Sequence, residues 1–383
     1  MTTAAPSPPI ALILSGGGAR AAYQVGVLRA IAESLPPDSP LPFRIVCGNS
    51  AGALNAAFLA ADAHCFDRGV RSLDQLWTML APQAIYRTES LRLLGAAFRM
   101  VRAFFRGAAV GGDLPAGLLD SGPLGSLLER TVDFAGIARN VEERRLDALA
   151  ITAFSYTSAR SVTFCQTASD QPMWARAQRR GVIDTITAAH LLASTAIPFI
   201  FPAVRIGDEY YGDGSMRQVA PTSPALHLGA ARIFVIGVTR SSSELRNGSA
   251  PGHVPSLAGI GAQMLANMFA DGMASDLERV RLVNIAVRQI PPDHVARSPV
   301  PLRDVGLFSI SPSVSPEALA RDYAGRLPPA LRRAFGGSRA ENNGGAGLAS
   351  YLLFDGDFCR ELIELGRRDA RTRIDEISQF LAT

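Results

Sequence analysis

Short apolar runs and longer segments with helical spacing alternate along the first 62 residues of the chain. The run Ile10–Ser15 is apolar and is followed by glycines, which predicts a buried strand. Apolar residues recur at helical spacing over Ala21–Leu35, Phe43–Gly48 is a second apolar run, and Ala51–Asp62 is rich in alanine. The resulting order of strand, glycine turn, helix, strand, tight turn and helix predicts a parallel sheet in an α/β fold.

The rest of the chain continues this pattern less regularly. Further strands are expected at Leu146–Tyr156, Ser161–Gln166, Val204–Tyr211, Arg232–Val238 and Arg281–Val287. Residues 184–194 have helical spacing, and residues 351–381 add alternating charge, which predicts a solvent-facing terminal helix.

No composition shift marks a domain boundary. We therefore expect a flexible leader at residues 1–9, a main domain at 10–240 with a helical insertion at about 73–112, and a C-terminal part at 241–383 that packs on the same domain and ends in a helix.

Composition narrows the chemistry further. The chain has 383 residues, of which 48% are hydrophobic and 19% charged, so a collagen, a coiled coil or a wholly disordered protein is excluded. All 38 basic residues are arginine, which excludes a lysine Schiff base or a Walker lysine. The four cysteines show no C-x-x-C spacing, and no His pair or acidic cluster has metal-ligand spacing. We expect no catalytic metal, no cofactor and no nucleic-acid partner.

The apolar segments are too short or too interrupted to predict a membrane span. The run at residues 10–14 is too short for the core of a signal peptide and lacks a preceding positive region. The apolar stretch Ile186–Val204 contains His190, Pro198 and Pro202, so no transmembrane helix is expected. We therefore expect a cytoplasmic protein, either free in the cytoplasm or peripheral at the cytoplasmic face of the membrane.

A glycine-rich loop follows the first predicted strand. Gly16, Gly17, Gly18, Ala19 and Arg20 come between that strand and a helix, where successive glycines let backbone N–H groups converge on an anion. The same residues fit a dinucleotide fingerprint, but the second strand ends without the acidic residue that this fingerprint needs. A phosphate or an oxyanion is therefore the favoured occupant.

A G-x-S-x-G motif follows the second predicted strand. Gly48, Asn49, Ser50, Ala51 and Gly52 lie between a strand and an alanine-rich helix, which is the context of a nucleophile elbow. In that context the hydroxyl of Ser50 stands at the carboxyl edge of the sheet, above the N-terminus of a helix. The motif predicts a nucleophilic serine.

A nucleophilic serine needs a general base, and two candidates remain. His227 follows the elbow and fits the Ser-Asp-His order of an α/β-hydrolase. Asp213 lies in a tight turn between Gly212 and Gly214 and is the stronger candidate, because a desolvated carboxylate is a competent base. The Asp-Gly pair is also an ordinary turn signal.

These three motifs, in this order, resemble those of the patatin-like phospholipase family. Its pattern combines a G-G-G-x-[RK] loop, a G-x-S-x-G nucleophile and a D-G-[GA] base motif, which match Gly16–Arg20, Gly48–Gly52 and Asp213–Gly214. Residues 193–202 are also similar to the family's S-x-A-x-P-x-x-F-P segment. The third residue of the base motif departs from the pattern, since it is Ser215.

The resemblance implies a three-layer α/β/α fold over roughly residues 10–240 and a lipid acyl hydrolase of the phospholipase A or lysophospholipase type. It implies a Ser50–Asp213 dyad, an acyl-enzyme on Ser50, and an oxyanion hole from the backbone N–H groups of Gly17 and Gly18. Arg20 would hold that loop or meet a lipid phosphate. A histidine-dependent esterase and a non-catalytic lipid-binding protein on the same scaffold are the alternatives.

One further segment has the character of a membrane-binding helix. On a helix over Leu91–Val110, four arginines including Arg102 share one sector, and Phe98, Phe104 and Phe105 lie among the apolar residues opposite. This pattern is typical of an interfacial helix and equally of a lid or insertion helix packed on the core. These four residues are the candidate membrane contacts.

Overall fold

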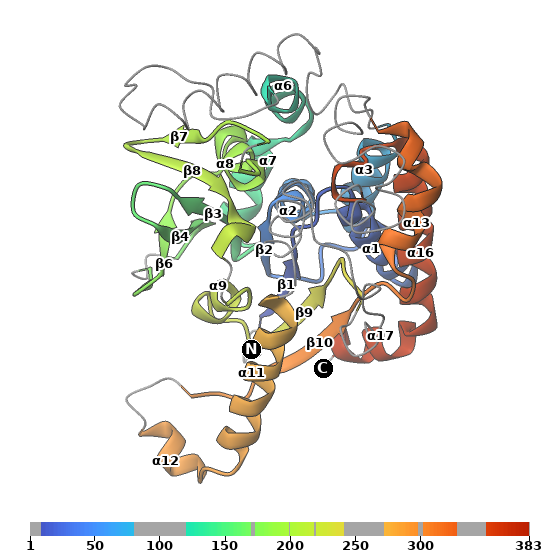
Figure 1. The fold of residues 1–383 in the computed structure, drawn as a ribbon. Helices are drawn as coiled ribbons and strands as arrows, with labels where there is room; N and C mark the ends of the chain where they lie inside the picture. Colours follow the sequence, from blue (N-terminus) through green and yellow to red (C-terminus); the bar gives the residue numbers. More distant parts are fainter. Residues whose placement is uncertain are drawn as a thin grey trace, which may run out of the picture.

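The computed structural model describes residues 9–79, 120–169, 173–198, 200–217, 220–240, 272–297, 302–327 and 350–382. Its centre is a mostly parallel sheet with helices on both faces (Figure 1). The candidate membrane contacts Phe98, Arg102, Phe104 and Phe105 lie outside the described residues, as does most of the expected insertion.

The sheet contains ten strands within the described residues. In chain order these are β1 (Ile10–Leu14), β2 (Ile45–Asn49), β3 (Ala148–Ser155), β4 (Arg160–Thr167), β5 (Ala175–Arg176), β6 (Arg179–Ile183), β7 (Val204–Ile206), β8 (Glu209–Asp213), β9 (Arg232–Ile236) and β10 (Gly306–Ile310). Strands β10, β9, β1, β2 and β3 are adjacent and parallel, and β4 and β8 pair with β3 in the antiparallel sense. The expected strands near residues 10, 45, 150, 163 and 234 are confirmed.

Helices occupy most of the connections between these strands. The α-helices are α1 (Ala22–Ser34), α2 (Ala51–Ala61), α3 (Phe66–Met79), α6 (Gly122–Thr131), α7 (Phe134–Glu142), α8 (Ala188–Thr195), α9 (Ser223–His227), α11 (Gly272–Arg288), α12 (Pro292–Ala296), α13 (Pro316–Tyr323), α16 (Gly356–Thr372) and α17 (Ile374–Ala382). Short 3₁₀ turns are η1 (Gly18–Ala21), η2 (Gly214–Arg217) and η4 (Ala324–Arg326).

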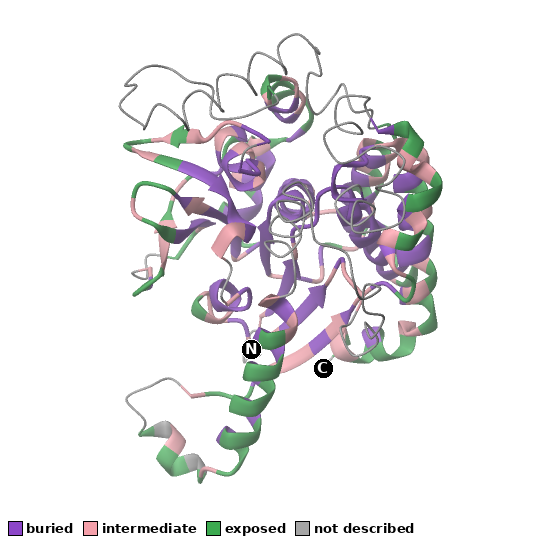
Figure 2. Ribbon diagram, viewed as in Figure 1, coloured by how far each residue is buried: buried purple, intermediate pink, exposed green. Residues whose placement is uncertain are grey.

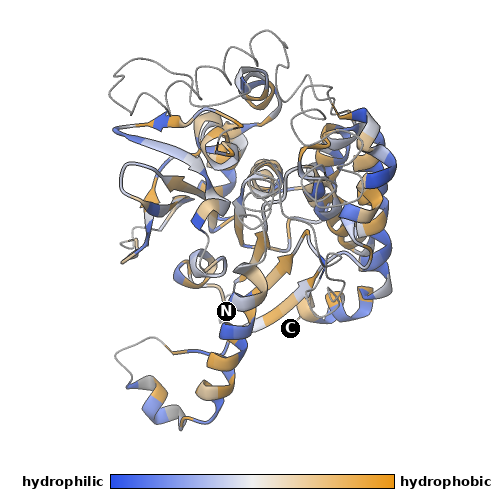
Figure 3. Ribbon diagram, viewed as in Figure 1, coloured by the Kyte–Doolittle hydropathy of each residue, from blue (hydrophilic) through white to orange (hydrophobic). Residues whose placement is uncertain are grey.

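Two apolar cores sandwich the sheet, because successive side chains of a strand point to opposite faces. Leu12 and Leu14 of β1 pack into the larger core with α1, α2, α3, α8 and α16. Ala11 and Ile13 pack into the smaller core, to which α9 and α11 contribute. The buried strands therefore lie between two helical layers (Figure 2), and the central parallel strands are largely hydrophobic (Figure 3). This is the expected three-layer α/β/α arrangement.

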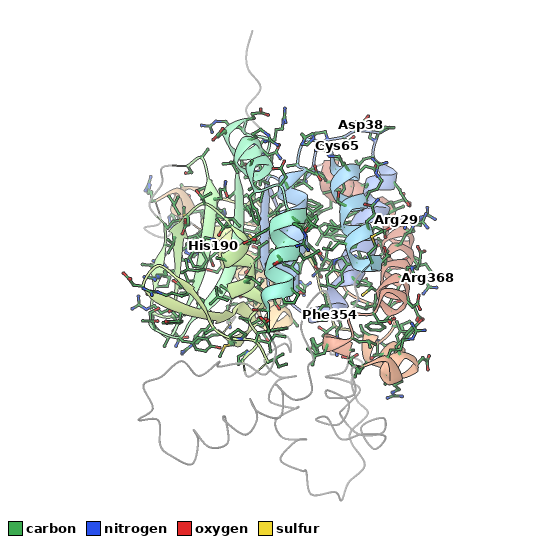
Figure 4. The ribbon with its side chains drawn as sticks, turned by 90° about the horizontal axis from the view of Figure 1, so that it is seen from above. Arg29, Asp38, Cys65, His190, Phe354 and Arg368 are labelled. Atoms are coloured by element: carbon green, nitrogen blue, oxygen red, sulfur yellow. The ribbon has the colours of Figure 1, made fainter. Side chains whose placement is uncertain are left out.

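The C-terminal helices are part of the larger helical layer. Helix α16 buries Phe358, Leu362 and Ile363 against α1, and the two helices cross closely where Gly26 faces the Ile363 carbonyl and Gly366 faces the Tyr23 carbonyl. Arg29 of α1 and Arg368 of α16 lie on the same outer flank of the molecule (Figure 4). The terminal segment is helical and exposes one face as expected, but the expectation of a single helix turned to solvent is wrong in part, since there are two helices and α16 buries its other face.

The expected strand at Arg281–Val287 is also wrong, because these residues belong to α11. Its β-branched residues suggested a strand. Its buried positions recur at helical spacing, however, and the helix extends away from the body toward α12 (Figure 1). These buried positions are Met273, Asp276, Leu277, Val280, Asn284 and Val287. The last parallel strand is β10, which follows α12 in the chain.

Candidate active site

Ser50 lies in a strained turn between β2 and α2. Its φ of 50° and ψ of −132° are unusual for a residue with a side chain, and such a conformation costs on the order of 1–3 kcal/mol. Gly52 makes the turn sterically feasible, because a Cβ there would collide with the Leu14 carbonyl of β1. The turn therefore has the geometry of a nucleophile elbow, with Ser50 at the N-cap of α2.

Strand β3 brings Asp213 to this elbow. Asn49, the last residue of β2, pairs with Thr152 of β3, and Asp213, the last residue of β8, pairs with Ala153. Strand β4 pairs with the other edge of β3, so β2 and β8 pair with the same edge, one after the other. The ends of β2 and β8 therefore meet, and the Ser50 hydroxyl donates a 2.6 Å hydrogen bond to Oδ2 of Asp213.

The Asp213 carboxylate is fully buried but hydrogen-bonded. Its Oδ1 accepts a 2.8 Å bond from the Ser215 backbone N–H, and its backbone N–H donates to the Ala196 carbonyl. Burial raises the pKa of Asp213 to about 6, and the bonds from Ser50 and Ser215 moderate that rise. The carboxylate is thus ionised near neutral pH and basic enough to accept a proton.

Buried polar side chains fix the backbone around the dyad. Ser194 Oγ accepts from the Ser50 N–H at 2.9 Å and donates to the Thr152 carbonyl at 2.7 Å. Asn49 links the two motif loops, because its Oδ1 accepts from the Gly16 N–H and its Nδ2 donates to Ser215 Oγ. Ser194 belongs to the S-x-A-x-P-like segment, which was the only signal in the sequence for its role.

The glycine-rich loop lies beside the serine. A Cβ on Gly16 would lie 2.8 Å from the Cβ of Ser50, so this loop and the elbow are in direct contact. Gly18 has a φ of +54°, which favours glycine, and begins η1. Within the described part of the chain the N–H groups of Gly17 and Gly18 donate to no protein acceptor. They are therefore the candidate donors to an oxyanion formed at Ser50.

A family of known proteins matches the part of the chain that carries this site. The family model for patatin-like phospholipases matches residues 12–226, which is more than half of the chain. The chain belongs to the patatin-like phospholipase family. The match begins in β1 and ends in α9, so it spans the glycine-rich loop, the elbow and Asp213.

Two solved structures are similar to this family member. One is human GIVD cytosolic phospholipase A2 in complex with methyl γ-linolenyl fluorophosphonate, at 11% identity and a TM-score of 0.42 over 98% of this chain. The chain covers 59% of that protein's length. The other is the type III effector protein ExoU, at 16% identity and a TM-score of 0.28, over 90% of this chain and 74% of that one. No curated protein sequence gives a significant match.

In this family member, the Arg20 side chain extends from the glycine-rich loop into the interior of the protein. The side chain is 1% exposed and contacts Ser350, Tyr351 and Glu317, which lie beyond the region that the family model matches. Its guanidinium is therefore directed toward the C-terminal third of the chain. No sequence motif indicated these three contacts.

His227 has a separate environment. Its Nδ1 is 2.7 Å from the Ser223 carbonyl oxygen, and its ring stacks on Trp174 at 4.8 Å. Burial lowers the pKa of His227, and nearby arginines lower it further. The Ser50 hydroxyl donates to Asp213 instead, so the described contacts join the serine to a carboxylate and not to this histidine.

Within the ranges that the structure describes, no three His, Cys, Asp or Glu residues are grouped so that they could hold a metal ion. No helix in that same part of the chain has both the length and the apolar character needed to cross a bilayer.

Proposed function

We propose that the protein is a lipid acyl hydrolase of the phospholipase A or lysophospholipase type that cleaves carboxylic esters through Ser50 and Asp213. Membership of the patatin-like phospholipase family supports lipid hydrolysis. The observation that carries the residue assignment is the 2.6 Å hydrogen bond from Ser50 Oγ to a fully buried carboxylate.

The proposed reaction has two halves. Asp213 accepts the Ser50 proton while Oγ attacks the ester carbonyl, and the N–H groups of Gly17 and Gly18 stabilise the oxyanion. The tetrahedral intermediate collapses as Asp213 returns the proton to the leaving alcohol, which leaves an acyl group on Ser50. Water then attacks the acyl-enzyme with Asp213 as base, and the fatty acid is released as Ser50 recovers its proton.

The surroundings of the dyad favour this chemistry. The pKa of about 6 leaves most of the Asp213 carboxylate ionised at neutral pH, and its burial limits competition from solvent. The elbow also places Ser50 at the N-terminus of α2, where the partial positive charge of the helix stabilises developing negative charge.

Release of fatty acid from mixed anionic phospholipid vesicles tests the proposal. Wild type should release acid, and Ser50→Ala should not. Absence of release from folded wild type that binds the vesicles would remove the phospholipase assignment. The non-catalytic lipid-binding alternative would then gain support.

We also propose a cytoplasmic protein with peripheral membrane contact through Phe98, Arg102, Phe104 and Phe105. The support is the basic and aromatic helical pattern of this segment. Phe104→Ser combined with Phe105→Ser should reduce co-sedimentation with anionic liposomes. Unchanged binding by the folded variant would leave the segment as an insertion or lid helix.

A further inference from the structure

The C-terminal third of the chain makes direct contact with the glycine-rich loop. Residues 315–317 and 350–354 lie beyond the region matched by the family model, yet both segments reach η1. At Gly18 the approach is so close that a Cβ would collide with the Tyr351 carbonyl. The loop is therefore covered on one side by chain that no catalytic motif includes.

Arg20 is the side chain through which this contact is organised. Its backbone N–H donates to the Gly17 carbonyl at 3.1 Å, so the residue belongs to the loop's own turn. Its Nε donates to Ser350 Oγ at 2.7 Å, its Nη1 lies 2.6 Å from Glu317 Oε1, and its guanidinium carbon lies 3.7 Å from the Tyr351 ring centroid. One planar cation thus joins the loop to two remote segments.

Glu317 carries the negative charge in this arrangement. It occupies the first turn of α13, and its Oε2 accepts a 2.5 Å hydrogen bond from the Ser315 hydroxyl at the N-cap. Its side chain is 34% exposed, whereas Arg20 is 1% exposed. Burial of a guanidinium costs free energy unless a nearby anion compensates its charge. Loss of the Glu317 carboxylate therefore makes the observed position of the Arg20 side chain less favourable.

The segment that carries Ser350 and Tyr351 is itself anchored in the core. Tyr351, Leu352, Leu353 and Phe354 are all buried, and Phe354 stacks on Trp77 of α3 at 6.3 Å. The segment therefore offers Arg20 a fixed surface, and Phe354 lies toward the middle of the molecule and not on its flank (Figure 4).

We propose that Glu317 and Tyr351 are positioning residues of the active site, which hold the N–H groups of Gly17 and Gly18 in place through Arg20. The inference rests on the proposed function, because it assigns these N–H groups to the oxyanion. Oxyanion donors act through preorganisation, and a displacement of about 1 Å can cost about 10²-fold in rate. The C-terminal third is thereby part of the catalytic unit.

Substitution of Glu317 tests the proposal on the full-length protein with a soluble short-chain ester. Glu317→Ala should lower kcat by about 10- to 100-fold with KM within about twofold, because the donors act on the transition state. Glu317→Gln keeps a hydrogen-bond acceptor without the charge, so its kcat should lie between those of Glu317→Ala and wild type. Glu364→Gln is the matched control, since Glu364 is an exposed carboxylate of the same C-terminal third that pairs with arginines away from the loop.

Tyr351 supplies an independent pair of variants. Tyr351→Phe keeps the ring face under the guanidinium, whereas Tyr351→Leu removes it. The proposal expects kcat to fall clearly more in Tyr351→Leu than in Tyr351→Phe. Equal losses in the two variants, or no loss in either, would remove Tyr351 from the assignment.

Hydrogen–deuterium exchange separates this proposal from the proposed function. Amide exchange over residues 15–23 should increase in Glu317→Ala and stay at the wild-type level in Glu364→Gln. Unchanged exchange in folded Glu317→Ala would overturn the inference whatever the activity, as would faster exchange with unchanged kcat. If wild type hydrolyses no ester, the proposed function fails, and exchange alone still decides whether Glu317 holds the loop.

Discussion

The Ser50 hydroxyl donates a 2.6 Å hydrogen bond to Asp213 Oδ2, although 163 residues separate the two in the chain. Strand β3 sets this distance, because β2 pairs with it as far as Thr152 and β8 pairs with it from Ala153 onward. The two catalytic candidates are thus brought together by consecutive residues of one central strand. A one-residue slip of β8 would turn the Asp213 side chain to the opposite face of the sheet.

The first prediction concerns the identity of the general base. Asp213→Asn should reduce ester hydrolysis by at least about 10³-fold, as should Ser50→Ala, because each removes a member of a unit that acts together. His227→Ala should keep activity within about twofold, since His227 contacts Ser223 and Trp174. Rates on a soluble ester and on vesicles would measure this, and a collapse in His227→Ala alone would favour a histidine-dependent esterase.

The second prediction is the pH dependence of the rate. Asp213 must be ionised to act as a base, and its pKa is raised to about 6 by burial. We expect kcat/KM to fall about tenfold for each pH unit below about 6 and to be flat just above it. Profiles from pH 4.5 to 8 on a soluble ester would measure the acid limb. The same limb should persist in His227→Ala, and its disappearance there would contradict the assignment.

The third prediction concerns how the Asp213 carboxylate makes the stability of the protein depend on pH. The folded-state pKa of Asp213, about 6, lies above its ordinary value of 3.8, so the folded protein binds more protons between these values. Stability from this group is therefore present at low pH and is lost as pH rises through about 6. The difference between these two pKa values corresponds to about 3 kcal/mol in the free energy of unfolding. Asp213→Asn should gain stability relative to wild type as the pH rises.

Denaturant unfolding of both proteins from pH 4 to pH 7.5 would measure this gain. The other ionisable groups are common to both proteins and largely cancel in the difference. A stability difference that does not change with pH would mean that Asp213 titrates at its ordinary value. The carboxylate would then be a weaker base than proposed.

The sequence predicted the parallel half of the sheet and the three motifs because strands and motifs of this kind depend on local patterns. The runs at Ile10 and Phe43 are apolar on both faces, and the glycine and serine motifs lie directly after them. Asp213 could be proposed as a base from its turn between Gly212 and Gly214, and the family resemblance made that assignment more specific. Its pairing with Ala153 is a long-range contact that no local pattern encodes.

The errors share a different physical cause. Val280, Val283, Ile285 and Val287 favour a strand by propensity, yet they continue α11, whose first half packs Met273, Leu277 and Val280 into the smaller core and whose exposed Val283 and Ile285 lie beyond it. The contacts of Arg20 were inaccessible to sequence reasoning, since Glu317 and Tyr351 are separated from it by about 300 residues and belong to no motif. Tertiary packing alone brings them together.

The last prediction separates backbone strain from steric contact in the glycine-rich loop. Gly18 and Gly207 both have positive φ values, +54° and +57°. A Cβ on Gly207 meets no atom within 4 Å, whereas a Cβ on Gly18 would collide with the Tyr351 carbonyl. Gly207→Ala should therefore cost only about 1–2 kcal/mol of stability, from its left-handed backbone, and leave kcat unchanged.

Gly18→Ala should carry the same strain and also push the loop away from Tyr351. We expect a larger loss of stability than in Gly207→Ala and a fall in kcat of at least about 10²-fold, because the Gly17 and Gly18 N–H groups move with the loop. Thermal unfolding and steady-state kinetics of the two variants side by side would measure this. If Gly18→Ala matched Gly207→Ala in both properties, close contact with the C-terminal segment would not matter for the oxyanion loop, and the position of its donors would have to be set by β1 and Asn49 alone.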